Sequence, residues 1–427
     1  MMGQQSGIQE QLLFCFSLEN HVPKDHLLRG IHRLLDLGDL RQQLFGFYSP
    51  MGRPSIDPEL MIRMLICGLD LDDPVPDHST FSKNRHGRFR ESQAFRLLFE
   101  TVLQRCMAEG LVKGEGFATD ASIIKADAQR QHRVEGSETV DWGDPEQASR
   151  PVREYLTALE EANDPQESAR TLSLTDPAAT WTAAPGGPAF FAYCTNYLID
   201  LEAGIILDVE ASTVNKAAEA KATRTMIDRV EDKFDLKPEH LVGDTNYGTA
   251  TMFGWLVDEK DIEPHVPVFE KSERTDGTFG RSDFTFDAEN NRYICPAGKF
   301  LKTAWRSKKK NPYRYRASLL DCQSCPLKSQ CCPNMNHRQI DRSPHESARD
   351  VARAITKTDA YKQSRKERKK VEMLFAHLKR ILRVDKLRLR GFSGAHDEFL
   401  LAATAQNLRR MAKRLAINGP APQLIPA

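Results

Sequence analysis

The sequence predicts a mixed α/β protein with helical segments at both ends. Apolar residues recur at spacings of three and four over about residues 8–112 and again over about residues 346–416, as in amphipathic helices. Between them, short apolar runs typical of strands alternate with helical patterns. A Cys- and Lys-rich insert interrupts this α/β part. We therefore expect four regions, which are residues 1–112, 113–269, 270–345 and 346–427.

Length and composition indicate a soluble globular protein. A chain of 427 residues, 40% hydrophobic and 28% charged, is long enough for two or three domains with a buried core. It has no apolar run of about 18 or more residues, so we expect no membrane span. Its first residues lack the basic and apolar parts of a secretory signal. The sequence therefore predicts a cytoplasmic protein.

The first region is predicted to be a helical domain that contacts DNA. Residues 25–35 have helical apolar spacing, and residues 57–66 begin with a capping Asp57 followed by Pro58. Another helix is expected over about residues 91–110. Residues 78–90 form a basic stretch with interspersed aromatic residues, which favours a nucleic-acid contact.

The second region is predicted to form a mixed sheet. One short apolar strand ends at Asp120, and another leads into Asp244. An acidic insert over about residues 128–187, helical near 144–162, is long enough to be a lid, an arm or disordered. The other expected elements are strands at 189–199 and 205–213 joined as a hairpin, a helix at 216–234, a strand at 240–243, a helix at 249–260 and a strand at 263–268.

Charge is distributed unevenly, although the formal net charge is only +1. Residues 135–176 carry 11 acidic and 3 basic side chains. Residues 299–316 carry 8 basic and no acidic side chains, and residues 361–390 carry 12 basic and 3 acidic ones. Each block could be a solvated face. Two basic blocks in the half of the chain that contains Glu372 favour a nucleic-acid surface.

Glu372 lies in a predicted amphipathic helix. Glu372, Arg368 and Lys379 fall on one stripe at the edge of the apolar face. We therefore expect Glu372 to be half-buried beside basic groups, where a metal ion or these cations would offset the cost of burying its charge. The alternative is an ordinary salt-bridged surface glutamate. The apolar positions of the face are Val371, Leu374, Phe375, Leu378 and Leu382.

Asp120 and Asp244 are more informative together than singly. An aspartate at the end of a strand commonly caps a turn or the next helix. These two follow short apolar strands of the same predicted sheet. Together with Glu372 they predict one site of three carboxylates, whose oxygens suit divalent cations. The basic surface in the same part of the sequence points to a phosphodiester substrate.

The cysteines of the insert predict a structural Zn²⁺ site. A cytosolic chain should not use its nine cysteines as disulfides. Four thiolates drawn from Cys295, Cys322, Cys325 and Cys331 (or Cys332) would bind zinc. The alternative is a set of buried free cysteines. The remaining four are interpreted as core residues, namely Cys15, Cys67, Cys106 and Cys194.

With these motifs the chain resembles the bacterial insertion-sequence DDE transposases. The resemblance covers nearly the whole chain and rests on FATDASIIKADA with Asp120, GDTNYG with Asp244, and RKKVEMLFAHLKR with Glu372. The spacing Arg368-x3-Glu372-x6-Lys379 matches part of the family signature, while Arg365 stands where a tyrosine is often found. The segments GRPSIDPELMIRMLI and VPDHSTFSKNRHGRF resemble the family's N-terminal domain.

The resemblance implies an RNase H-like catalytic core that cleaves DNA and transfers strands. Asp120, Asp244 and Glu372 would hold Mg²⁺ (or Mn²⁺). Basic residues would contact phosphates of double-stranded DNA, both transposon ends and target. A homodimer is expected, because two ends must be processed together. The residues implied in DNA binding are Arg368, Lys379, Arg365 and Lys369.

One departure from the family concerns the N-terminal domain. Relatives usually continue after the RMLI segment with a further helical stretch, whereas here Cys67-Gly-Leu-Asp follows Ile66 directly. This predicts a shortened domain with impaired binding of the element's ends. Two alternatives therefore stay open: a degenerate copy that only binds DNA as a repressor, and an RNase H-like nuclease.

Overall fold

The computed structural model describes residues 23, 26–48, 51, 56–67, 78–135, 140–145, 147–162, 171–183, 186–269, 276–306 and 313–418. The chain divides into two compact units. Unit 1 comprises Met1–Lys113, Ala121–Asp235 and Lys370–Ala427, and unit 2 comprises Gly114–Asp120 and Leu236–Lys369. None of the helices in the described ranges has the length and apolarity that crossing a membrane requires.

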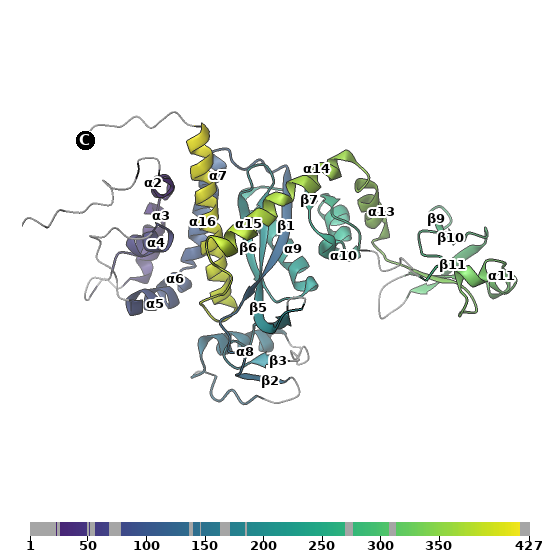
Figure 1. The fold of residues 1–427 in the computed structure, drawn as a ribbon, viewed down its shortest axis with the longest axis horizontal. Coiled ribbons are helices and arrows are strands. Elements are labelled where there is room, and N and C mark those ends of the chain that lie inside the picture. Colours follow the sequence, from purple (N-terminus) through teal and green to yellow (C-terminus); the bar gives the residue numbers. More distant parts are fainter. Residues whose placement is uncertain are drawn as a thin grey trace, which may run out of the picture. The chain divides into compact units, whose positions relative to one another are not determined.

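The central sheet has six strands and mixed pairing, as predicted, which is consistent with an RNase H-like core (Figure 1). Its order is β4-β5-β1-β7-β8, with β6 also paired to β5. The pairs β4·β5 and β5·β6 are antiparallel, whereas β1·β7 and β7·β8 are parallel. The strands are β1 (Gly116–Lys125), β4 (Thr180–Ala183), β5 (Ala189–Asp200), β6 (Ile206–Ser212), β7 (His240–Val242) and β8 (Glu263–His265).

The hairpin of unit 1 is buried on both faces. In β5 every residue from Phe191 to Asp200 is buried, as expected for a strand covered on both sides. The side-chain amide of Asn196 bonds across the hairpin: its Nδ2 donates to the Glu210 carbonyl at 3.0 Å and to Ser212 Oγ at 2.9 Å. These bonds satisfy polar groups that would otherwise be costly to bury.

Helices of unit 1 build the core that covers this hairpin. Helix α9 (Lys216–Phe234) matches its predicted range, begins with Asn215 accepting from the Ala218 amide at 2.7 Å, and buries Met226 and Val230. Helix α16 (Phe392–Asn418) contacts α7 and β6. The other helices of this unit are α2 (Leu27–Leu34), α3 (Gly38–Leu44), α4 (Pro58–Cys67), α5 (His78–His86), α6 (Arg88–Glu91), α7 (Ala94–Ala108), α8 (Arg150–Ala162) and α15 (Lys369–Arg380), with short strands β2 (Arg133–Glu135) and β3 (Thr171–Ser173) and the turn η1 (Phe45–Phe47).

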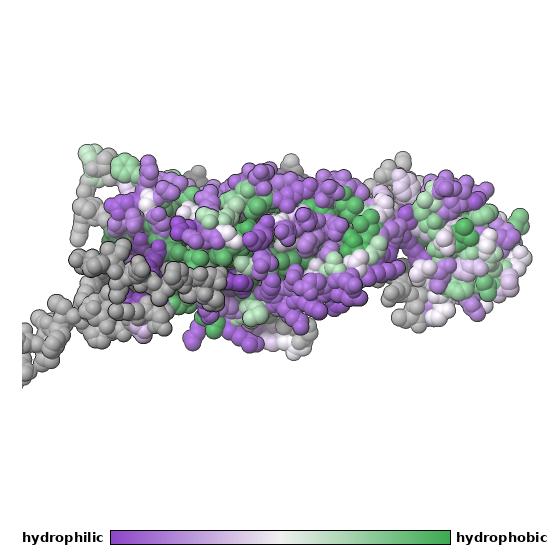
Figure 2. Space-filling view, turned by 90° about the horizontal axis from the view of Figure 1, so that it is seen from above, coloured by the Kyte–Doolittle hydropathy of each residue, from purple (hydrophilic) through white to green (hydrophobic). Residues whose placement is uncertain are grey.

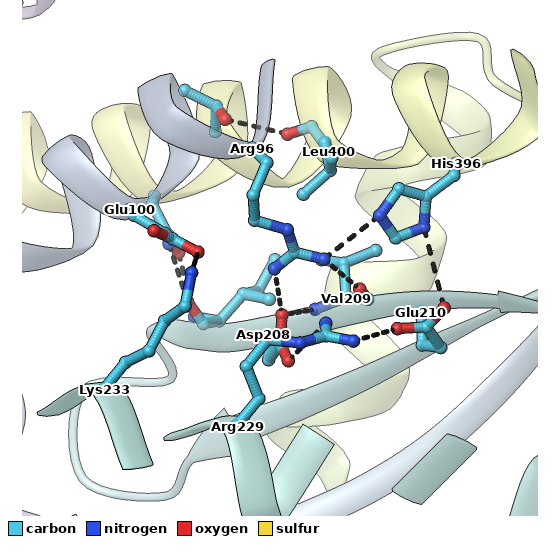
Figure 3. A network of polar contacts seen from close by, with 12 residues as sticks. Arg96, Glu100, Asp208, Val209, Glu210, Arg229, Lys233, His396 and Leu400 are labelled. Carbon is cyan, nitrogen blue, oxygen red and sulfur yellow. Dashed lines mark hydrogen bonds and ion pairs between the residues drawn. The ribbon is translucent and has the colours of Figure 1, made fainter. Parts of the chain in front are cut away.

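A buried ion network joins four elements of unit 1 (Figure 3). Asp208 of β6, 1% exposed, accepts from Arg96 of α7 and, at 2.9 Å, from Arg229 of α9. Arg229 also donates to Glu210 at 2.7 Å, and Arg96 Nη2 lies 3.1 Å from His396 Nε2 on α16. The two guanidinium groups thus pair with the carboxylate of Asp208. Burying this charge without a partner would be strongly unfavourable.

Unit 2 has its own core beside β7 and β8. Tyr247, Phe253 and Val266 pack with Ala348 and Ala352. The predicted helix at 249–260 forms as α10 (Ala250–Gly254) followed by a π-helical turn, η3 (Trp255–Glu259). Two further helices, α13 (Glu346–Ile355) and α14 (Asp359–Glu367), belong to this unit.

The Cys-rich insert folds as a five-stranded antiparallel sheet with the order β13-β12-β11-β10-β9. Tyr293, Leu301 and Tyr315 form its core with the buried cysteines. Leu320 is 76% exposed, and apolar side chains show among hydrophilic ones over this insert (Figure 2). Its elements are β9 (Thr285–Asp287), β10 (Arg292–Ile294), β11 (Phe300–Arg306), β12 (Tyr313–Ala317), β13 (Gln339–Arg342), α11 (Leu319–Gln323) and α12 (Lys328–Cys331).

Candidate active site

Asp120 lies within β1, and Asp244 lies two residues beyond the end of β7, the strand that runs parallel to β1 in unit 2. The last pair in register is Ala118 of β1 with Val242 of β7, and Asp120 and Asp244 each lie two residues further along. Asp244 keeps an extended backbone, with φ −86° and ψ 178°. Both carboxylates are half-buried.

The backbone around Asp244 allows the strands to approach closely. A Cβ atom added to Gly243 would lie 3.4 Å from Thr119 Cγ2 on β1 and 3.1 Å from Tyr247 Cδ2. A Cβ atom added to Gly248 would lie 2.1 Å from the Pro267 carbonyl oxygen, so only glycine fits there. Close contacts at Gly243 and Gly248 therefore leave little or no room for a side chain at these positions of the GDTNYG segment.

Asn246 holds the Asp244 carboxylate in place. Asp244 Oδ1 accepts from the Asn246 amide at 2.8 Å, and Oδ2 accepts from Asn246 Nδ2 at 3.3 Å. Asp244 thereby caps the 3-10 turn η2 (Thr245–Tyr247). This is the capping role typical of such aspartates. Sequence reasoning missed Asn246, although an Asp-x-Asn turn signature marks it.

Asp120 differs from its predicted position. It was expected at or near a strand end, but β1 continues to Lys125, so Asp120 is a mid-strand residue. The continuation is explained by long-range pairing within unit 1: the Ala126 amide donates to the Phe191 carbonyl at 2.9 Å, and the Lys125 amide donates to the Asp385 carbonyl at 3.2 Å.

The helix around Glu372 forms, but Glu372 is exposed rather than half-buried. Helix α15 buries the predicted face of Val371, Leu374, Phe375 and Leu378. Glu372 projects away from this face, and none of the described residues pairs with it. The predicted half-burial of Glu372 was therefore wrong, although Arg368 and Lys379 of the same stripe are half-buried. Glu372 and the two aspartates belong to different units.

The predicted DNA-binding residues have unequal surroundings. Arg365 and Lys369 are exposed, while Arg368 and Lys379 are half-buried. Arg368 forms a turn between α14 and α15, so the predicted continuous helix from residue 368 begins one residue later. Burial lowers the pKa of Lys379, whose ammonium group lies near Cys194 and Asp385.

The insert brings its cysteines around one small cavity. Cys295, Cys322, Cys325, Cys331 and Cys332 line it together with Lys299, Lys328 and Arg338. The Lys299 amide donates to Cys295 Sγ at 3.3 Å, and all five thiols are free. Burial raises the pKa of Cys331 to about 12. Cys106 and Cys194 are buried core residues, as predicted.

Within the described ranges, no three His, Cys, Asp or Glu side chains are arranged to hold a metal ion. This applies to the carboxylates and to the cysteines alike. Residues 68–77, which follow the point where the N-terminal domain was predicted to be shortened, lie outside the described part, as does Cys15.

Two family models match the chain. One, described as a transposase DDE domain, covers residues 294–412, which include Glu372 and the cysteines of the insert but neither Asp120 nor Asp244. The other, described as a transposase domain, covers residues 16–67. No curated protein matches the chain. These two matches, at opposite ends of one chain, indicate an insertion-sequence DDE transposase.

Proposed function

We propose that this transposase cleaves DNA at the ends of its insertion sequence and transfers the strands, with Asp120, Asp244 and Glu372 as the catalytic carboxylates. The observation that supports the proposal is the parallel register of β1 and β7, because extending it by two residues would pair Asp120 with Asp244. Two acidic side chains at adjacent positions repel each other unless a cation or a proton lies between them. A divalent cation is the partner that suits both oxygens.

The proposed roles follow from the surroundings of each residue. Asp120 and Asp244 would be oxygen ligands, with Asn246 fixing the orientation of Asp244. Glu372 would be the third ligand, because its exposed carboxylate has no partner in the described part of the chain. Mg²⁺ or Mn²⁺ bound there supplies charge stabilisation and a nucleophile at neutral pH for an in-line displacement at phosphorus.

Basic side chains would hold the DNA backbone. Arg365 and Lys369 are exposed cations, and we assign them contacts with phosphates. Arg368 and Lys379 would act from half-buried positions, where burial lowers the pKa of Lys379. We further propose that the transposase works in the cytoplasm as a homodimer on double-stranded DNA, since two ends must be joined to one target.

Asp244→Asn tests the carboxylate site. The variant keeps the size of the side chain and its acceptor for Asn246 but removes the charge, so metal-dependent cutting should be lost while DNA binding remains. The assay is nicking and strand transfer on a supercoiled plasmid that carries the element's ends, with Mg²⁺ or Mn²⁺. Asp261→Asn is the matched control, because Asp261 is an exposed residue of the same unit with φ +52°, a conformation that asparagine tolerates.

The same assay separates the alternatives. End-specific strand transfer by the wild type supports a transposase, unspecific nicking a nuclease, and binding without cutting a repressor. Cutting that survives in Asp244→Asn would remove these carboxylates from the mechanism. Weak protection of the element's ends beside efficient nicking would fit the predicted shortening after Ile66.

We also propose a structural Zn²⁺ ion at the insert, with ligands from Cys295, Cys322, Cys325 and Cys331 (or Cys332). Five thiols around one cavity support it, although their side chains would have to turn toward the ion. The purified protein should contain one bound zinc per chain by elemental analysis, which Cys322→Ser should lose. Cys332→Ser should keep the zinc if Cys331 is the fourth ligand. A folded, zinc-free wild type would favour the alternative of free cysteines.

A further inference from the structure

Unit 1 contains a cavity of about 510 Å³ with an unusually basic wall. Five of its lining residues are arginines, and one is an acid, Asp127. The arginines come from three distant segments: α5, the first turn of α8, and the chain between α15 and α16. We call this site the arginine pocket, and its lining residues are Arg85, Asp127, Arg150, Pro151, Arg153, Arg388, Leu389 and Arg390.

Hydrogen bonds hold the wall of the arginine pocket in place. Arg150 donates to Ser393 Oγ at 2.5 Å and to the Arg390 carbonyl, which ties α8 to the C-terminal segment. Arg390 Nε donates to the Asp127 carbonyl at 2.8 Å and to its carboxylate at 3.1 Å. Because these contacts fix the backbone on both sides, the pocket is formed before any ligand arrives.

The acids near the arginine pocket are already engaged. Glu154 Oε1 accepts from Arg150 at 2.9 Å, and Asp397 Oδ2 accepts from Arg90 at 3.0 Å. Glu398 Oε1 accepts the backbone amides of Arg388 and Leu389 at 2.8 and 2.5 Å. These contacts leave the positive charge of the pocket in excess over the negative charge around it.

Two further features of the arginine pocket favour the binding of an anion. Burial lowers the pKa of Arg85 and Arg150, and repulsion from Arg90 adds to the effect at both. In addition, α8 begins at Arg150, so the positive end of a 13-residue helix lies in the wall. Guanidinium groups match the geometry of phosphate oxygens and bind them in pairs.

We propose that the arginine pocket binds a backbone phosphate of duplex DNA, as a contact that uses none of the catalytic carboxylates. This rests on the proposed function, which makes DNA the substrate. Pockets for small molecules of this size are mostly apolar, whereas this wall is cationic and has few apolar side chains. The basic block at 361–390, which ends with Arg388 and Arg390, brings further positive charge to the same segment.

The test uses Arg153→Ala and Arg388→Ala, singly and together. Both side chains are exposed, whereas Arg150 and Arg390 hold the wall and could unfold it when replaced. Affinity for a short fluorescent duplex is measured over a range of salt concentrations. Each lost phosphate contact should weaken binding about tenfold and reduce the slope of log affinity against log salt by about 0.9. Arg388→Lys, which keeps the charge, should restore most of that slope.

Arg105→Ala is the matched control, because Arg105 is 55% exposed in the same unit, lies outside the pocket and pairs with its helix neighbour Glu109. If the double variant binds with the affinity and salt slope of this control, the arginine pocket is not a DNA site. In that case DNA cleavage that Asp244→Asn abolishes would still support the proposed function. If the wild type binds no duplex, both proposals fail.

Discussion

At the scale of single residues, unit 1 depends on a charge buried among helices. Asp208 is bound by Arg96 and Arg229, and its side chain is 2% exposed (Figure 3). Arg229 keeps a second partner in Glu210, whereas Arg96 has no other carboxylate in the network as described. Removing the Asp208 charge would therefore leave a half-buried guanidinium poorly paired, which costs much more than the loss of a surface ion pair.

Asp208→Asn should lower the free energy of unfolding by about 3 kcal/mol, because it removes one partner of a buried pair. Asp341→Asn is the control, since Asp341 is 46% exposed and pairs with Arg314 at the surface, where the loss should be about 1 kcal/mol or less. Urea unfolding followed by circular dichroism gives both values. Equal losses in the two variants would show that the network contributes no more than a surface pair.

At the scale of elements, local signals predicted the structure well where they were strong. Helix α9 has its predicted bounds, because Asn215 caps it and its apolar residues keep a helical period. The hairpin of β5 and β6 was found from two apolar runs around a turn. The strand that contains Asp120 and the strand that precedes Asp244 were also expected from their apolar residues. The elements beside these two aspartates could thus be predicted from short stretches of sequence, while the site itself stays a prediction.

Elements formed by long-range pairing could not be predicted in the same way. In the insert, β12 pairs with β13 although α11 and α12 lie between them, and β9 and β10 are only three residues long. Strand β1 passes beyond Asp120 because its second half bonds to segments far along the chain. The exposure of Glu372 and the presence of the arginine pocket depend on which elements pack beside each residue. The periodicity within one helix carries no information about those neighbours.

At the scale of the whole molecule, one buried acid couples folding to pH. Asp176 is fully buried and accepts a hydrogen bond from Tyr193 Oη at 2.5 Å, and burial raises its pKa to about 6. The unfolded chain loses this proton near pH 4, so between about pH 4 and pH 6 the folded chain binds more protons. The contribution of Asp176 to stability is therefore full below about pH 4 and falls as the pH rises to about 6, by at most about 3 kcal/mol.

Asp176→Asn removes this titration while keeping an oxygen that accepts from Tyr193. Stability is measured by chemical unfolding of the wild type and the variant between about pH 4 and pH 7. As the pH rises, the free energy of unfolding of the variant should increase relative to that of the wild type, because only the wild type must then bury a carboxylate. Tyr193→Phe is a second test variant, because without the hydroxyl donor the charged form of Asp176 is less stabilised. In this variant the stability contributed by Asp176 should begin to fall at a similar pH but continue to fall to a higher pH than in the wild type. Parallel pH curves for wild type and Asp176→Asn would mean that Asp176 ionises in the folded chain as readily as in the unfolded one.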